Sequence, residues 1–168
     1  MLIMVMGLPG SGKSFFAKRF AAKMGAEYIS SDALRIEMGL RGKYLSKNKT
    51  DVYLKMAERA KDWIRKNKSV VLDATFFQKK YRELIYSIAE ANQISLHLIL
   101  VQADENIIQQ RLSVPRKDSE ADHSVYLKIK DKFEPIEKSF LLLDSTNENL
   151  EEILIKAHKY ILRPNEQK

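Results

Sequence analysis

The feature that most constrains this chain is a glycine-rich segment near its N-terminus, Gly7-Leu8-Pro9-Gly10-Ser11-Gly12-Lys13-Ser14. An apolar run at residues 2–6 precedes it, and residues 15–22 follow without Gly or Pro and with apolar residues spaced as in a helix. The pattern G-x-x-x-x-G-K-[ST] between a strand and a helix is that of a phosphate-binding P-loop. The segment therefore predicts a strand-loop-helix unit at the start of an α/β fold.

The residue types of this loop predict its chemistry. Glycines let successive N–H groups turn toward an anion, and the helix start adds unpaired donors and a positive dipole end. Lys13 is expected to reach the β- and γ-phosphates of a nucleoside triphosphate, and Ser14 to ligate Mg²⁺. We predict ATP and Mg²⁺ as cofactors. The residues expected to contact the nucleotide here are Leu8, Pro9, Gly10, Ser11, Gly12, Lys13, Ser14 and Phe15.

Length and composition fit one domain. The 168 residues are enough for a single core, which we place at residues 1–162, with a frayed polar tail at 163–168. The absence of cysteine excludes disulfides and thiol catalysis. With no apolar run of membrane-spanning length and no room for a signal peptide, we expect a cytoplasmic protein that does not contact a membrane. The net charge of +7 either attracts polyanions or serves ATP binding and solubility.

Apolar patterning predicts alternating strands and helices. The expected strands are 2–6, 26–30, 69–73, 94–101 and 139–143. The expected helices after the first are 33–38, 50–66, 79–91, 104–112, 122–133 and a last one that opens at a capping-box pattern, Ser145-Thr146-Asn147-Glu148, and runs to 161. Residues 40–49 and 113–121 are expected to be loops. This alternation is typical of a parallel sheet that helices cover on both faces.

Ligands of such sheets bind at the carboxyl ends of the strands. Asp32 follows the second strand, and Arg35 lies on the same face if a helix begins there. Asp32 is a candidate general base for an attacking hydroxyl, and Arg35 is a candidate ligand for an anionic acceptor. The alternative is that Asp32 only caps the helix and that Arg35 pairs with Glu37 or with solvent.

Asp73 ends the third strand, where a Walker B carboxylate would help to hold Mg²⁺. It could instead bind the acceptor, or cap the following turn. Arg111 and Arg116 flank a polar loop whose cations could close over the γ-phosphate and neutralise charge that develops during transfer. A solvated charge cluster is the alternative for these two arginines.

Five stretches in this order resemble one family. They are the P-loop, Ser30-Ser31-Asp32-Ala33-Leu34-Arg35, Val70-Val71-Leu72-Asp73-Ala74-Thr75, Gln110-Arg111-Leu112 with Arg116, and Asp144-Ser145-Thr146. Together they are similar to the small P-loop kinases related to polynucleotide kinase, a group that also resembles zeta toxins and nucleoside monophosphate kinases. The resemblance covers nearly the whole chain.

The resemblance implies an α/β three-layer sandwich with a five-stranded parallel sheet in the order 2-3-1-4-5 and a short lid. It implies that Asp32 is the general base for a 5′-hydroxyl and that Arg35 contacts the 3′-phosphate of the acceptor. Asp73 would orient the acceptor, Arg116 would be the lid arginine, and Arg111 would lie near the adenine.

The expected function is ATP-dependent transfer of the γ-phosphate to a hydroxyl, first of all the 5′-hydroxyl of DNA, RNA or a nucleotide. Related small kinases also phosphorylate sugars, sugar acids or nucleotide sugars, so a small metabolite is the alternative acceptor. A nucleotide-dependent nucleic-acid-binding module is a third possibility. The sequence leaves the acceptor and the oligomeric state open.

Overall fold

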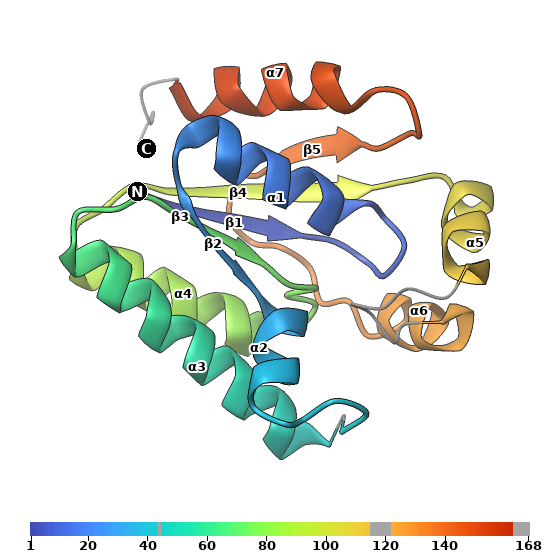
Figure 1. Cartoon of the computed structure of the whole chain (residues 1–168), viewed down its shortest axis with the longest axis horizontal. Helices are drawn as coiled ribbons and strands as arrows, with labels where there is room; N and C mark the ends of the chain where they lie inside the picture. Colours follow the sequence, from blue (N-terminus) through green and yellow to red (C-terminus); the bar gives the residue numbers. More distant parts are fainter. Residues whose placement is uncertain (44, 115–121, 163–168) are drawn as a thin grey trace.

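The structure is a computed structural model that describes residues 1–43, 45–114 and 122–162. Its strands are β1 (Leu2–Met6), β2 (Glu27–Ser30), β3 (Val70–Asp73), β4 (Leu96–Gln102) and β5 (Leu141–Asp144). They pair in parallel as a five-stranded sheet in the order β2-β3-β1-β4-β5 (Figure 1). The predicted fold class is therefore confirmed, including the strand order.

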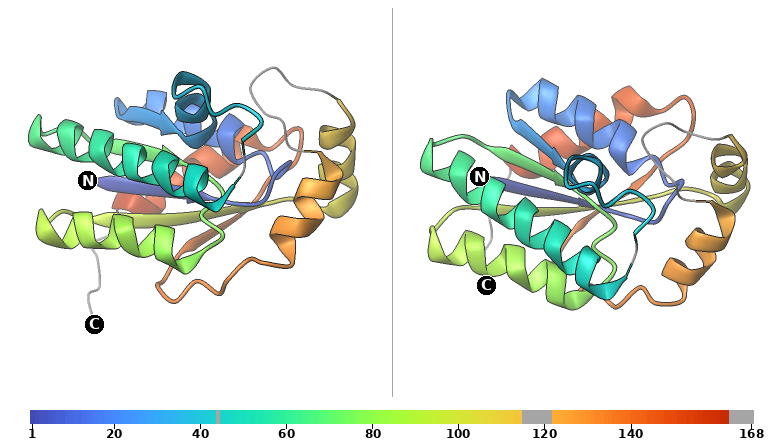
Figure 2. Two further views of the ribbon diagram at one scale, coloured as in Figure 1. Left: turned by 90° about the horizontal axis from the view of Figure 1, so that it is seen from below. Right: turned by 60° about the horizontal axis from the view of Figure 1, so that its bottom comes forward.

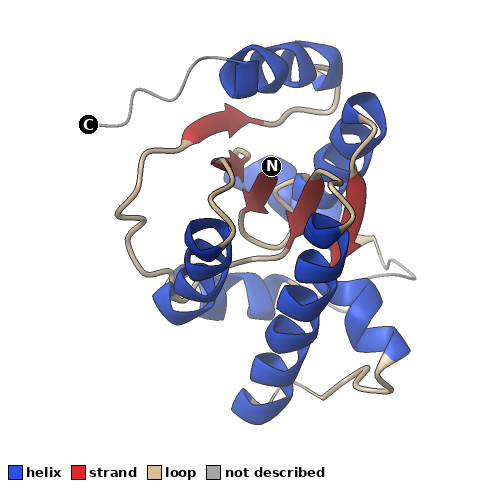
Figure 3. Cartoon of the chain, turned by 90° about the vertical axis from the view of Figure 1, so that its left-hand side faces the viewer, coloured by secondary structure: helices blue, strands red, loops and turns tan. Residues whose placement is uncertain are grey.

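Helices cover both faces of this sheet. They are α1 (Lys13–Met24), α2 (Ser31–Glu37), α3 (Ser46–Arg65), α4 (Lys79–Ala91), α5 (Glu105–Ser113), α6 (His123–Lys130) and α7 (Leu150–Leu162). Helices α1 and α7 lie on one side of the sheet and α3 and α4 on the other (Figures 1 and 3). Helices α5 and α6 stand beyond the carboxyl end of β4, as all the views in Figures 1 and 2 agree.

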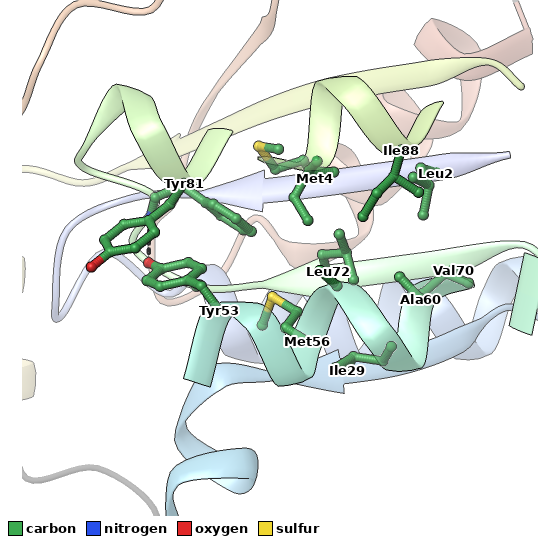
Figure 4. Close-up of a cluster of buried hydrophobic side chains, with 14 of the residues drawn as sticks. Leu2, Met4, Ile29, Tyr53, Met56, Ala60, Val70, Leu72, Tyr81 and Ile88 are labelled. Carbon is green, nitrogen blue, oxygen red and sulfur yellow. Dashed lines mark hydrogen bonds between the residues drawn. The ribbon is translucent and has the colours of Figure 1, made fainter. Parts of the chain in front are cut away.

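The central strand explains why the sheet needs two helical layers. All five residues of β1 are buried, so its side chains must pack on both faces. Ile3 and Val5 belong to the core beneath α1 and α7, whereas Leu2 and Met4 belong to the core beneath α3 and α4 (Figure 4).

Two aromatic rings close this second core on the side toward which β1 points. Tyr53 of α3 and Tyr81 of α4 stack with their ring centroids 3.9 Å apart (Figure 4). This stacking packs α3 against α4 at this end of the sheet.

Several predicted boundaries were wrong. Helix α3 begins at Ser46 rather than at residue 50, because the Thr50 hydroxyl donates to the Ser46 carbonyl and the Lys49 N–H to the Leu45 carbonyl in an added first turn. Lys49 therefore lies on a helix, not in the predicted loop. Helix α6 ends at Lys130 rather than at residue 133.

The predicted capping box at residues 145–148 does not start the last helix. Helix α7 begins at Leu150, and the Thr146 hydroxyl instead accepts from the N–H groups of Glu148 and Asn149. Ser145 is buried and accepts from Arg111, so its hydroxyl serves a long-range contact.

In the described part of the chain, no helix is both long enough and apolar enough to cross a membrane. The tail predicted to be frayed, residues 163–168, lies outside the described residues.

Candidate active site

The P-loop joins β1 to α1 through glycines in conformations that side chains disfavour. Gly7, Gly10 and Gly12 have φ angles of 150°, 81° and 87°. A Cβ on Gly7 would lie 2.3 Å from the Val101 carbonyl oxygen, and one on Gly12 would lie 2.6 Å from Ser145 Oγ. The loop thus packs against β4 and against the segment after β5 so closely that only glycine fits. Lys13 and Ser14 follow directly as the first residues of α1.

Asp73 lies next to this loop at the carboxyl end of β3. It pairs in register with Val5 of β1 on one side and with Ser30 of β2 on the other. Its side chain is buried, at 1% exposure, and its Oδ2 atom accepts a 2.6 Å hydrogen bond from the Tyr28 hydroxyl. Its Oδ1 atom is buried without a hydrogen-bond partner among the described residues. A buried carboxylate oxygen of this kind suits a cation or a donating ligand.

Tyr28 was not predicted as a site residue. Burial, followed by the charge of Asp73, raises the pKa of Tyr28 above its ordinary value, so that the phenol keeps its proton and acts as a donor. In the sequence, the one signal for this role was the position of Tyr28 near the end of the second strand, two residues before Ser30, which pairs with Asp73.

Asp32 and Arg35 follow β2 on the short helix α2, as predicted. The N-cap of α2 is Ser30, whose hydroxyl accepts from the Ala33 N–H at 3.4 Å, so Asp32 is not needed as the cap. Burial, and to a lesser extent the charge of Asp32, raises the pKa of both Tyr28 and Tyr53. Burial is the main cause of the raised pKa of Tyr53, about 12.

Arg35 is largely buried and held against the chain that follows α2. Its Nη1 atom donates to the Lys43 carbonyl at 2.9 Å, and the side chain is 8% exposed. Glu37, the alternative partner considered for it, forms an ion pair with Arg59 of α3. The guanidinium of Arg35 therefore lies between α2 and the start of α3.

The segment after β3, which follows Asp73 directly, is held in place by hydrogen bonds. Phe76 adopts a φ angle of 48°, uncommon for a residue with a side chain. Its N–H donates to the Tyr53 hydroxyl at 3.1 Å, and its carbonyl accepts from Arg82 at 2.8 Å. The fully buried Arg82 also donates to the Pro135 carbonyl at 2.5 Å. Sequence reasoning missed this role, although Arg82 precedes Ile85 by one helical turn and so interrupts an apolar stripe.

Arg111 connects α5 to the P-loop. Its guanidinium donates to the Gly10 carbonyl at 3.3 Å, to Ser145 Oγ at 3.3 Å and to Asn147 Oδ1 at 3.1 Å. Arg111 thus lies against the P-loop, and its predicted contact with adenine stays a prediction. Arg116, the predicted lid arginine, lies outside the described residues.

A cavity of about 330 Å³ lies on the lid side of the P-loop. Leu8 and Ser11 of the loop line it together with the end of β4 and the helices α5 and α6. Glu105 of α5 accepts from the Tyr126 hydroxyl at 3.1 Å and pairs with Lys130, which fixes α6 to α5. The two helices flank residues 115–121, which belong to the loop that carries the predicted lid arginine and lie outside the described residues.

The donors present fit Mg²⁺ and a phosphate chain. No group of three or more His, Cys, Asp or Glu side chains that could hold a metal occurs in the described ranges. A site made of the Ser14 hydroxyl and the Asp73 carboxylate leaves most positions to phosphate oxygens and water, as Mg²⁺ prefers.

Phe15, also predicted to contact the nucleotide, exposes 55% of its surface and carries the Arg19 guanidinium 3.5 Å above its ring. Its predicted contact therefore rests on its backbone N–H.

A family model described as an AAA domain (AAA_33) matches residues 2–136. The chain belongs to this AAA domain family. The matched range of the AAA domain includes the P-loop, Asp32, Asp73 and Arg111.

Solved structures share the fold of this AAA domain at low sequence identity. A sugar kinase from Janibacter sp. HTCC2649 aligns with a TM-score of 0.73 at 19% identity, over 95% of this chain and 93% of that one. A gluconokinase from Sinorhizobium meliloti 1021 aligns with a TM-score of 0.69 at 21% identity, over 92% and 87% of the two chains. The Mycobacterium tuberculosis APS kinase CysC, in complex with AMPPNP and APS, aligns with a TM-score of 0.70 at 13% identity, over 96% and 97%. The AAA domain therefore has the fold of P-loop kinases.

Proposed function

We propose that this AAA domain is an ATP-dependent kinase that transfers the γ-phosphate to a hydroxyl group of a small metabolite. The observation that carries the proposal is the alignment of the strand ends. Ser30, Asp73 and Val5 pair in register across β2, β3 and β1, so that Asp32, Asp73 and the P-loop follow three neighbouring strands. A phosphate loop flanked by two carboxylates suits transfer to a hydroxyl better than binding alone.

In the proposed reaction, the P-loop N–H groups and Lys13 hold the β- and γ-phosphates. Asp32 accepts the proton of the acceptor hydroxyl, whose oxygen attacks the γ-phosphorus while the bond to the β–γ bridging oxygen breaks. ADP leaves with the electron pair of that bond, and the acceptor leaves as a phosphate ester.

Asp73 and Ser14 are the proposed protein ligands of Mg²⁺, which neutralises charge on the phosphate oxygens when bound. Tyr28 keeps the Asp73 carboxylate in one orientation through its 2.6 Å hydrogen bond. Asp73 contacts the acceptor instead if Ser14 and the phosphates hold Mg²⁺ without it.

The structural neighbours support a small acceptor. They include a sugar kinase, a gluconokinase and an APS kinase in complex with APS, and each aligns over almost the whole chain. Transfer to the 5′-hydroxyl of DNA or RNA is the second candidate, which the net charge of +7 favours.

An acceptor screen tests the proposal. ADP release from ATP and Mg²⁺ is measured with sugars, sugar acids, nucleosides, nucleoside 3′-phosphates and 5′-hydroxyl oligonucleotides. We expect a small hydroxyl compound to raise ADP release well above the acceptor-free rate, and Asp32→Asn to abolish that increase. Asp62→Asn, an exposed change on α3, is the matched control. Stimulation by oligonucleotides alone, weakening steeply with salt, would instead favour the second candidate.

A further inference from the structure

Four segments bring cationic side chains together beside α2. Arg35 comes from α2, Lys49 from the first turn of α3, Lys80 from the start of α4, and Lys132 from the segment after α6. Lys49 is half-buried, and its Nζ atom lies 5.6 Å from the centroid of the Phe77 ring. Burial lowers the pKa of Lys49, and the charges of Arg35, Lys132 and Lys80 lower it further.

The fold fixes the positions of these segments. Thr50, next to Lys49, forms a 3.2 Å hydrogen bond with the Tyr81 hydroxyl, which joins the start of α3 to the start of α4 beside Lys80. The N–H of Glu134, two residues after Lys132, donates to the Phe77 carbonyl at 2.9 Å. Hydrogen bonds therefore hold the segments that carry Lys49, Lys80 and Lys132 against one another.

Two carboxylates that follow Lys132 in the chain are engaged by Lys79. Glu134 accepts from the N–H of Lys79, and Glu137 pairs with the Lys79 ammonium at 2.6 Å. Like charges that gather on a partly desolvated ammonium are unfavourable in the free protein. A negatively charged ligand would reverse this cost and would be held by charge-assisted hydrogen bonds.

We propose that the acceptor carries an anionic group, a phosphate, sulfate or carboxylate, which Lys49 binds together with Arg35. Lys80 and Lys132 add to the positive potential that draws this group in. The anion then anchors the acceptor beside α2 and α3, so that its hydroxyl faces Asp32. This inference rests on the proposed kinase function and makes Lys49 a residue that determines acceptor specificity.

Matched acceptor pairs test the inference by kinetics. Sugars are compared with their acids and monophosphates, and nucleosides with nucleoside 3′-phosphates. We expect the anionic member to have the higher kcat/KM. Lys49→Gln should raise the KM for the anionic acceptor about tenfold or more, the size of one lost charge-assisted hydrogen bond, without changing the KM for ATP. Lys61→Gln removes an exposed lysine from the same helix and should change neither value.

A binding measurement tests the inference without turnover. With ADP and Mg²⁺ saturating the P-loop, sodium sulfate is titrated into protein whose lysines carry a ¹³Cε label. We expect the Lys49 signal, assigned from the Lys49→Gln spectrum, to shift with saturation while the Lys61 signal stays unchanged. Neutral acceptors used as well as anionic ones, with unchanged kinetics in Lys49→Gln, would overturn the inference and leave the kinase function intact. Absence of turnover with every acceptor would contradict the kinase function, and an unshifted Lys49 signal would then overturn the inference as well.

Discussion

Tyr28 and Asp73, on adjacent strands and far apart in the sequence, are joined by a 2.6 Å hydrogen bond beside the P-loop. The bond uses Oδ2 of the carboxylate, and Oδ1 is buried without a hydrogen-bond partner among the described residues. Tyr28 thus acts on the site through another residue and is a positioning residue in this account.

Replacing Tyr28 by Phe tests this relationship. The variant keeps the ring but leaves Asp73 without its donor, so the carboxylate is less well oriented. We expect kcat to fall about tenfold, a typical cost of losing the hydrogen bond that orients a ligating or catalytic group. Steady-state kinetics should give an unchanged KM for ATP, and thermal unfolding should confirm that the fold persists. An unchanged kcat would show that the reaction does not need the Tyr28 hydrogen bond to orient Asp73.

Gly12→Ala tests the close packing of the P-loop. The added Cβ would meet Ser145 Oγ at 2.6 Å and Arg111 Nη1 at 3.0 Å, at a φ angle of 87°. We expect ATP affinity to fall by at least about tenfold, because the loop must move away from Arg111 and lose its cradle shape. Equilibrium binding of ATP measures the effect.

Gly25→Ala is the matched control for that variant. Gly25 has a φ angle of 58° and open space around its Cβ position, so the change carries backbone strain alone. A similar loss of ATP affinity in both variants would show that steric contact with Ser145 is not the cause.

Arg82→Leu tests the hydrogen bonds that hold the segment after β3. The change leaves the carbonyls of Phe76 and Pro135 without their buried donor. We expect the free energy of unfolding to fall by about 1–3 kcal/mol, the cost of leaving the buried Phe76 carbonyl unsatisfied, because water can reach the carbonyl of the exposed Pro135. Urea denaturation measures it, and Arg65→Leu, at an exposed arginine of α3, should cost far less.

His97 predicts how stability depends on pH. It is 5% exposed on β4, and burial, followed by the charge of the N-terminal ammonium, lowers the pKa of His97. The unfolded chain then binds the proton more tightly than the folded one, so this residue's stabilising contribution is full above pH about 6.5 and is lost as the pH falls through the lower folded value.

Urea denaturation of wild type and His97→Leu, at neutral pH and at pH about 5, measures this contribution. We expect the wild type to lose more of its free energy of unfolding on acidification than the variant, by at most about 1.4 kcal/mol per pH unit. His123→Gln, a change at an exposed histidine, should lose as much of its free energy of unfolding on acidification as the wild type does. An equal loss of the free energy of unfolding on acidification in the wild type and in His97→Leu would show that His97 does not cause the pH dependence.

The sequence predicted the parts of the site that local patterns encode. The P-loop, Asp32 and Asp73 each stand at or just after the end of a predicted strand, so the rule for carboxyl ends of parallel strands was enough to place them. Tyr28, Ser145 and Arg82 were missed because their roles depend on partners far along the chain. Ser145 was interpreted as part of a capping box because its long-range partner Arg111 cannot be seen from neighbouring residues.

Helix boundaries failed for a different, local reason. The polar residues from Ser46 to Lys49 do not stand out as helical, and their added turn depends on hydrogen bonds that begin at Leu45. This error mattered, since it hid Lys49 in a presumed loop, away from Arg35 and the start of α4.

Product analysis tests whether the γ-phosphate is transferred to an acceptor hydroxyl. The protein is incubated with ATP, Mg²⁺ and the best acceptor of the screen, and ADP, inorganic phosphate and phosphorylated acceptor are quantified together by ³¹P NMR. The account predicts that phosphorylated acceptor forms in equal amount to ADP, and that Asp32→Asn lowers this rate about a hundredfold or more, as expected for loss of a general base. ADP accompanied by inorganic phosphate alone, with no phosphorylated acceptor, would contradict it.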